Sequence, residues 1–354
     1  MVREATTERH PYIDPSTGFE VVQITDRPGA DNTHFYFHDP AWTPDSRWLV
    51  FRSNRTERTE LFRYEVETGE ISPLTEGYSA GNWVSRLRPE AFYCVGTEVR
   101  TIDVETRETQ TIGRLPDRME FRSAPSENAD GTLLVFGATV GDQVGIYSMH
   151  RGTGETRAIR IADDRPGHIH CSPTDPDLIM HCDATVSDAE PKQRVWILST
   201  DGTRHWHPYT QTPQEWLTHE SWLGKTGRVL ICYWPTGLIE IEPDGSGFRM
   251  IAKINAWHAG ATDDGRYCVV DTNWPDRGIH LIETETGRMC KVCESFNNPS
   301  GSGTHPHPSF SPDGRWIIYG SERTGSPEVY LVDTRQAIER DDRWWTPENA
   351  WDRW

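Results

Sequence analysis

Short apolar runs separated by tight-turn signals recur along almost the whole chain. The clearest are Trp48–Phe51, Tyr267–Val270 and Trp316–Tyr319, each preceded by an Asp-Ser or Asp-Gly turn and followed by a loop and a second apolar run. Asp-Gly turns favour hairpins because glycine adopts a positive φ without a steric cost. The pattern therefore predicts a succession of short antiparallel strands.

Four weaker copies fill the intervals, and their apolar runs are Ala91–Val95, Leu133–Phe136, Leu178–Met180 and Val229–Tyr233. The resulting seven units have a period of about 40–50 residues, which is the range of propeller blades. Closing such units into a ring protects their exposed strand edges. We therefore predict an all-β fold, a seven-bladed β-propeller of four-stranded antiparallel blades. An array of β-sandwiches is the alternative, but a single period running through the chain disfavours it.

The two ends of the chain have different predicted roles. Phe19–Ile24 is a lone alternating segment before the first unit, and we expect it to supply the outer strand of the last blade and so close the ring. Residues 1–335 are predicted to form one propeller domain. Residues 336–354 are charged and rich in tryptophan, and this tail lies outside the repeat.

Composition limits the classes of partner. The formal net charge of −18 argues against nucleic acid or an anionic membrane as a general partner. The polar start of the chain and the lack of an apolar run of about 18 residues predict a cytoplasmic location. The seven cysteines are odd in number and lie mostly in strand-like runs, which predicts buried thiols, Cys290 and Cys293 included, and not a disulfide framework. The oligomeric state is left open.

Histidines recur at one position of the repeat, just before the strand and turn that open a unit. In five of the seven units this position holds His34, His168 with His170, His219, His258, or His305 with His307. In a propeller these segments converge at one end of the central channel, where ligands bind. A single histidine here would more often be a structural hydrogen-bonding residue. The recurrence instead indicates a metal or proton-transfer site.

His305 and His307 lie two residues apart, with Pro306 and Pro308 beside them. The prolines forbid a helix, and side chains at i and i+2 share one face of an extended strand. With His258, three neutral imidazoles could bind one divalent ion and leave positions open for substrate oxygens. The set contains no cysteine, so Mn²⁺ is as plausible as Zn²⁺. Arg194 opens an apolar strand and could pair with a substrate carboxylate or form a surface salt bridge.

These residues resemble those of the oligogalacturonate lyases, seven-bladed propellers that cleave short pectic oligosaccharides. The resemblance covers nearly the whole chain, and it is most specific at Thr304–Phe310, Thr218–Trp222 and Gly167-His168. It implies a metal, usually manganese, on His258, His305 and His307. Ser302 occupies the place of a further glutamine ligand.

The resemblance also implies that His219 is the base and Arg194 the substrate-binding arginine. We expect His168 and His34 to border the substrate. The implied reaction is β-elimination on oligosaccharides that contain uronate, most plausibly oligogalacturonides, to give 4,5-unsaturated products. The metal and Arg194 would stabilise the charge that develops on the carboxylate, so a histidine base would suffice.

Two alternatives remain. The first is a lyase on a different acidic glycan, because Ser302 and loops shorter than the family's in the middle and sixth blades alter the cleft. The second is a non-catalytic propeller that binds a partner or a sugar, as in Tol-Pal-type periplasmic proteins, whose repeats also use Ser-Pro-Asp-Gly.

Overall fold

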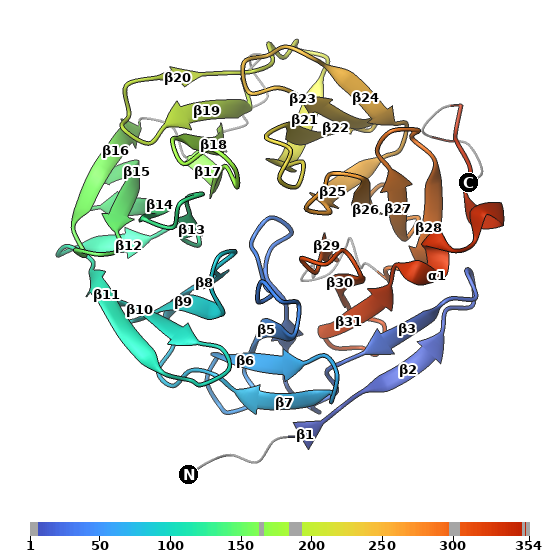
Figure 1. The fold of residues 1–354 in the computed structure, drawn as a ribbon, viewed down its shortest axis with the longest axis horizontal. Helices are drawn as coiled ribbons and strands as arrows, with labels where there is room; N and C mark the ends of the chain where they lie inside the picture. Colours follow the sequence, from blue (N-terminus) through green and yellow to red (C-terminus); the bar gives the residue numbers. More distant parts are fainter. Residues whose placement is uncertain (1–5, 163–165, 184–192, 297–304, 349–350, 352–354) are drawn as a thin grey trace.

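The computed structural model describes residues 6–162, 166–183, 193–296, 305–348 and 351, which form seven antiparallel sheets around a central channel (Figure 1). This arrangement confirms the predicted seven-bladed β-propeller. Four of the sheets have four strands and three have five. Apolar residues fill both faces of most blades, because each blade packs between two others.

The first three sheets contain strands from residues 6–162. In sheet order they are β1 (Thr6–Thr7), β7 (Glu70–Pro73), β6 (Glu60–Glu65), β5 (Trp48–Ser53) and β4 (Asn32–Thr33); β11 (Thr109–Arg114), β10 (Glu98–Asp103), β9 (Glu90–Val95) and β8 (Ala80–Val84); and β12 (Met119–Phe121), β14 (Leu133–Val140), β15 (Gln143–His150) and β16 (Thr156–Ala162), with β13 (Ser126–Glu127) also on β14.

The next three sheets follow in chain order. They are β17 (Pro166–Cys171), β18 (Leu178–Asp183), β19 (Val195–Ser199) and β20 (His205–Trp206); β21 (Trp216–Trp222), β22 (Val229–Trp234), β23 (Gly237–Ile241) and β24 (Arg249–Ala252); and β25 (Ala256–Ala261), β26 (Tyr267–Thr272), β27 (Ile279–Glu283) and β28 (Met289–Cys293).

The seventh sheet joins the two ends of the chain. Its order is β2 (His10–Ile13), β3 (Glu20–Gln23), β31 (Glu328–Asp333), β30 (Trp316–Ser321) and β29 (Ser309–Phe310). Strand β3 pairs antiparallel with β31, with Val22 opposite Leu331, which confirms that the segment around residues 19–24 closes the ring. The structure adds β2 outside β3, and β1 on the edge of the first blade.

The core lies between the blades. One buried cluster joins Leu49 and Phe51 of the first blade to Val84 of the second and Leu331 of the seventh. Burial of these side chains in both neighbouring interfaces makes each blade dependent on the next. All seven cysteines are free and buried, as predicted.

The C-terminal segment lies against the outside of the ring. It contains a short helix α1 (Arg335–Ile338) and a 3₁₀ turn η1 (Asp341–Arg343). Trp344 packs on the core shared by the sixth and seventh blades, and the backbone of Trp345 pairs with that of Met289 in β28. None of the helices found in the described part of the chain has the length and apolarity to cross a bilayer.

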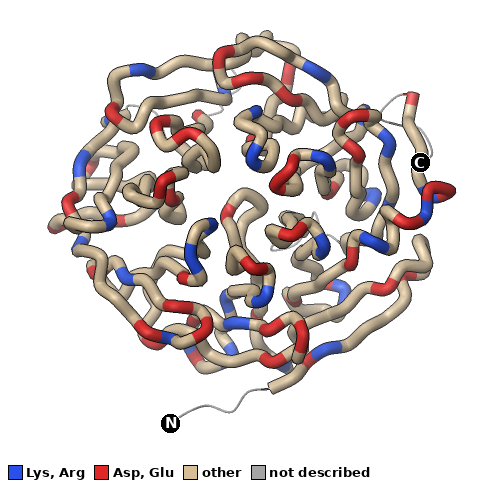
Figure 2. The backbone as a smooth tube through the Cα atoms, in the orientation of Figure 1, with Lys and Arg blue, Asp and Glu red and all other residues tan. Residues whose placement is uncertain are grey.

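Charged residues are spread around the ring. Figure 2 shows acidic and basic segments interleaved along the outer rim, so the net charge of −18 is distributed and not confined to one side.

Candidate active site

The clustered histidines lie in, or just before, the inner strands of four blades. Strands β17, β21, β25 and β29 are the innermost strands of their sheets and occupy equivalent places around the channel (Figure 1). His168 lies near the start of β17, His219 in β21 and His258 in β25, and His307 precedes β29. The histidines that recur at equivalent positions of the repeat therefore meet in one site.

The backbone is locally distorted where these histidines stand. His168, His219 and His307 have φ of 44°, 45° and 47°, in the left-handed region that side chains other than glycine rarely adopt. The strand pairing also shifts by a bulge between Thr218 and Glu220, and equivalent bulges occur in β17 and β25. A bulge redirects side chains, and strain of this kind is typical of functional sites.

Three imidazoles converge as expected for a metal centre. Ligand atoms of His258, His305 and His307 all lie within 4.8 Å of one another. The His258 ring centroid is 4.3 Å from that of His307 and 5.4 Å from that of His305. Burial, together with neighbouring imidazoles, holds the pKa of His258 and His307 well below the usual value, so both present neutral nitrogen lone pairs.

A buried carboxylate orients the first of these histidines. Asp271 in β26 accepts a hydrogen bond from Nδ1 of His258 at 2.8 Å and another from the His258 backbone N–H at 2.7 Å. Burial raises the pKa of Asp271 to about 7. With its Nδ1 proton directed to Asp271, His258 offers Nε2 to a metal, the arrangement that carboxylates impose on histidine ligands.

Asp271→Asn is expected to weaken Mn²⁺ binding about 10–100-fold. An asparagine amide cannot accept both hydrogen bonds, and its NH₂ group favours the tautomer of His258 in which Nε2 carries the proton. A titration with Mn²⁺, read as metal retained after desalting, measures the change. Asp264→Asn, in the exposed turn after β25, is the matched control and should bind like the native protein. Equal affinity for the two variants would contradict the role of Asp271.

A second buried carboxylate connects two further predicted residues. Glu220 in β21 is fully buried and accepts hydrogen bonds from Nδ1 of His168 at 2.8 Å and from Nε of Arg194 at 3.1 Å. Burial alone would raise the pKa of Glu220, but the charge of Arg194 and the contact with His168 lower it well below its usual value. Arg194 is thus held at the site by an ion pair through its Nε.

His219 lies between this pair and the three imidazoles. Its ring centroid is 4.2 Å from that of His258 and 5.6 Å from that of His168. Burial first, and then the neighbouring His258, holds the pKa of His219 well below the usual value. The Thr218 hydroxyl lies 2.9 Å from Nδ1 and can accept its proton, which leaves the lone pair on Nε2. In that tautomer His219 is a neutral imidazole whose Nε2 lone pair is available.

The chain between β4 and β5 projects into the middle of the channel (Figure 1) and supports the histidines from inside. Nε2 of His34 lies 2.8 Å from the carbonyl oxygen of Pro306, so His34 fixes the backbone between His305 and His307. The Tyr36 hydroxyl lies 3.2 Å from Nε2 of His168.

Of the residues predicted from the sequence, seven are brought to this site: His34, His168, Arg194, His219, His258, His305 and His307. Ser302 lies outside the described residues. Three residues were missed, namely Tyr36, Glu220 and Asp271. Asp271 left a signal, a lone acid in the apolar run Tyr267–Thr272, but a strand pattern does not say that it faces a histidine.

Fold and site together define a seven-bladed β-propeller with a polyhistidine centre at one mouth of its channel. No family model matches the chain. Two curated relatives do: the oligogalacturonate lyase of Dickeya dadantii (strain 3937), 24% identical, and the oligogalacturonide lyase of Pectobacterium atrosepticum, 22% identical. Each match covers 93% of this chain and 97% of the relative.

Solved structures agree. An oligogalacturonate lyase in complex with manganese superposes with a TM-score of 0.84 and 21% identity, over 99% of this chain and all of that one. The oligogalacturonate lyase of Vibrio parahaemolyticus gives 0.83 and 20%, over 95% of this chain and all of that one. The resemblance seen in the sequence is confirmed: over nearly its whole length the chain is similar to oligogalacturonate lyases in sequence and in fold.

Proposed function

We propose that the protein is a metal-dependent lyase that cleaves oligogalacturonides by β-elimination. The observation that carries this proposal is the meeting of His258, His305 and His307 beside a free neutral imidazole, His219, and the anchored guanidinium of Arg194. The names of the curated relatives support the substrate, and the manganese complex of a structural neighbour supports the metal.

The donor set fits a divalent ion such as Mn²⁺. His258, His305 and His307 would hold it, because their nitrogens are close together and the pKa of both His258 and His307 is lowered. When bound, the metal supplies Lewis-acid stabilisation to the substrate carboxylate, whose charge grows as the neighbouring proton leaves.

The remaining residues would carry the proton transfer and the charge. His219 takes the C5 proton of the uronate on Nε2, the C5–H electron pair forms the C4–C5 double bond, and the C4–O bond breaks to release the shortened oligosaccharide. The leaving oxygen is protonated by solvent or by the imidazolium of His219. Arg194 would form charge-assisted hydrogen bonds to a substrate carboxylate, and Glu220 keeps its guanidinium in place.

The test is a panel of oligosaccharides incubated with the protein and Mn²⁺, with formation of the unsaturated product followed by ultraviolet absorbance. Di- and trigalacturonate are expected to give the signal, and a chelator should abolish it. A signal only with oligomers of another uronate would favour the lyase on a different acidic glycan. Folded, metal-loaded protein that is silent across the panel would leave the non-catalytic propeller.

A further inference from the structure

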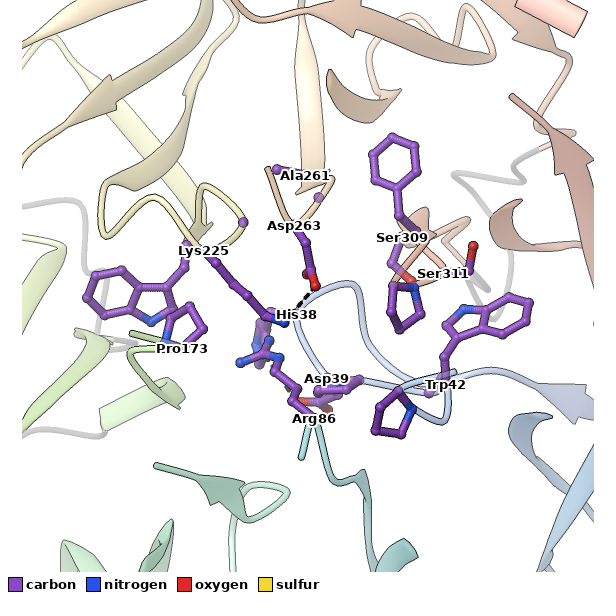
Figure 3. Close-up of a pocket in the computed structure, with 18 of the residues that line it drawn as sticks. His38, Asp39, Trp42, Arg86, Pro173, Lys225, Ala261, Asp263, Ser309 and Ser311 are labelled. Carbon is purple, nitrogen blue, oxygen red and sulfur yellow. Dashed lines mark ion pairs between the residues drawn. The ribbon is translucent and has the colours of Figure 1, made fainter. Parts of the chain in front are cut away.

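The opposite mouth of the channel contains a cavity of about 290 Å³. Its walls include the turns that follow the inner strands: Pro173 after β17, Lys225 after β21, Asp263 after β25 and Ser311 after β29. The candidate active site lies at the other ends of the same strands. Figure 3 shows this cavity in close-up, with Pro173, Lys225, Asp263 and Ser311 around it.

The cavity has nitrogen atoms without partners. Among the residues that line it, the buried side-chain atoms with no hydrogen-bond partner in the described structure are Nη1 of Arg86, Nε1 of Trp42, Nε2 of His170 and both ring nitrogens of His38. The arginine and tryptophan nitrogens can only donate, and an imidazole can donate from one nitrogen. Buried donors of this kind are costly unless something accepts their protons.

The acidic residues around the cavity do not meet this need. Asp45 and Asp313 accept hydrogen bonds inside their own turns, from Thr43 and Ser311 among others. Asp263 pairs with Lys225 at 2.8 Å. A carboxylate oxygen of Asp39 approaches Nδ1 of His38 to 3.0 Å, but this contact lacks hydrogen-bond alignment.

Arg86 is the central donor. Its guanidinium carbon stacks 5.2 Å from the ring centroid of Trp83, a fully buried residue, and its Nη1 has no hydrogen-bond partner in the described parts of the chain. Figure 3 shows Arg86 and Lys225 reaching toward the middle of the mouth, where His38 lies. A desolvated guanidinium without a counter-ion is a strong attractor for a planar or tetrahedral oxyanion.

We propose that this mouth is a second binding site, which takes a small ligand bearing a carboxylate or phosphate group on Arg86, with His38, His170 and Lys225 around it. The cavity is of the size of a single small metabolite and not of a polymer. The proposal is independent of the proposed reaction, since it uses none of the residues assigned to it.

Only the imidazole rings of His38 and His170 would separate this site from the candidate active site. His38 stacks on His170 with ring centroids 4.6 Å apart, and its centroid is 5.3 Å from that of His168. A ligand bound to His38 and His170 would thus contact rings that pack against His168, the partner of Glu220.

The experiment measures anion binding and not turnover. Inorganic phosphate and acetate are titrated separately into the native protein at constant ionic strength, with the thermal midpoint and tryptophan fluorescence as readouts. We expect a saturable response to at least one, and the stronger of the two identifies the ligand as phosphate or carboxylate. Arg86→Met keeps the stem on Trp83 and should weaken binding by at least about tenfold.

Two further variants keep the test decisive. Lys225→Met changes an exposed rim residue and should fold even if Arg86→Met does not, with weaker anion binding expected. Arg58→Met removes an exposed arginine between β5 and β6 and should bind as the native protein does. The proposal is overturned if neither anion saturates the native protein. It is equally overturned if affinity is unchanged in a folded Arg86→Met variant or, should that variant not fold, in Lys225→Met.

Discussion

His219→Ala is expected to lower kcat for an oligogalacturonide by about 10²–10⁴-fold, the usual contribution of a general base, while Mn²⁺ binding is retained. The residue touches His258 but is not one of the three converging imidazoles. Alanine retains a Cβ at the strained φ of 45°, so the substitution removes the imidazole without relaxing the backbone. Initial rates and metal content on the same preparation give both readouts.

The matched control is His207→Ala, which removes an exposed imidazole from the loop after β20. It should leave the rate and the metal content as they are in the native protein. A His219→Ala variant that keeps its metal and loses less than about tenfold in kcat would exclude His219 as the base and direct attention to His168, its neighbour at 5.6 Å.

His307→Ala is expected to remove metal binding and activity together. Loss of one of the three converging imidazoles should cost more affinity than loss of a carboxylate that only orients a ligand, so a decrease beyond about 100-fold is expected. The φ of 47° again stays unfavourable for alanine, as it is for histidine. Elemental analysis after desalting, with the rate measured at increasing Mn²⁺, checks both effects.

High Mn²⁺ should partly restore the rate of His307→Ala but not that of His219→Ala, and this contrast separates a ligand from a base. His10→Ala, on the outer strand β2, is the control and should retain its metal. If His307→Ala binds Mn²⁺ as tightly as the native protein, the converging imidazoles are not the metal centre.

The propeller could be predicted because its determinants are local. Turn residues such as Asp313-Gly314 and the apolar runs beside them recur with one period, and each unit can be recognised without the others. The ring closure by β3 was also readable, since a lone alternating strand at one end needs a partner at the other. The strands β1 and β2 were missed because polar, exposed edge strands carry little hydrophobic pattern.

The sequence by itself determined the repeat, and with it the place where His168, His219, His258 and His307 recur, because a period fixes equivalent positions in every blade. Only the tertiary structure decided how these side chains are aimed and held. The bulges in the inner strands turn them inward, and Asp271 and Glu220 reach them across pairs of strands. These contacts join residues that are far apart in the sequence and that no sequence pattern connects. Their energies depend on burial, which exists only once the ring is closed.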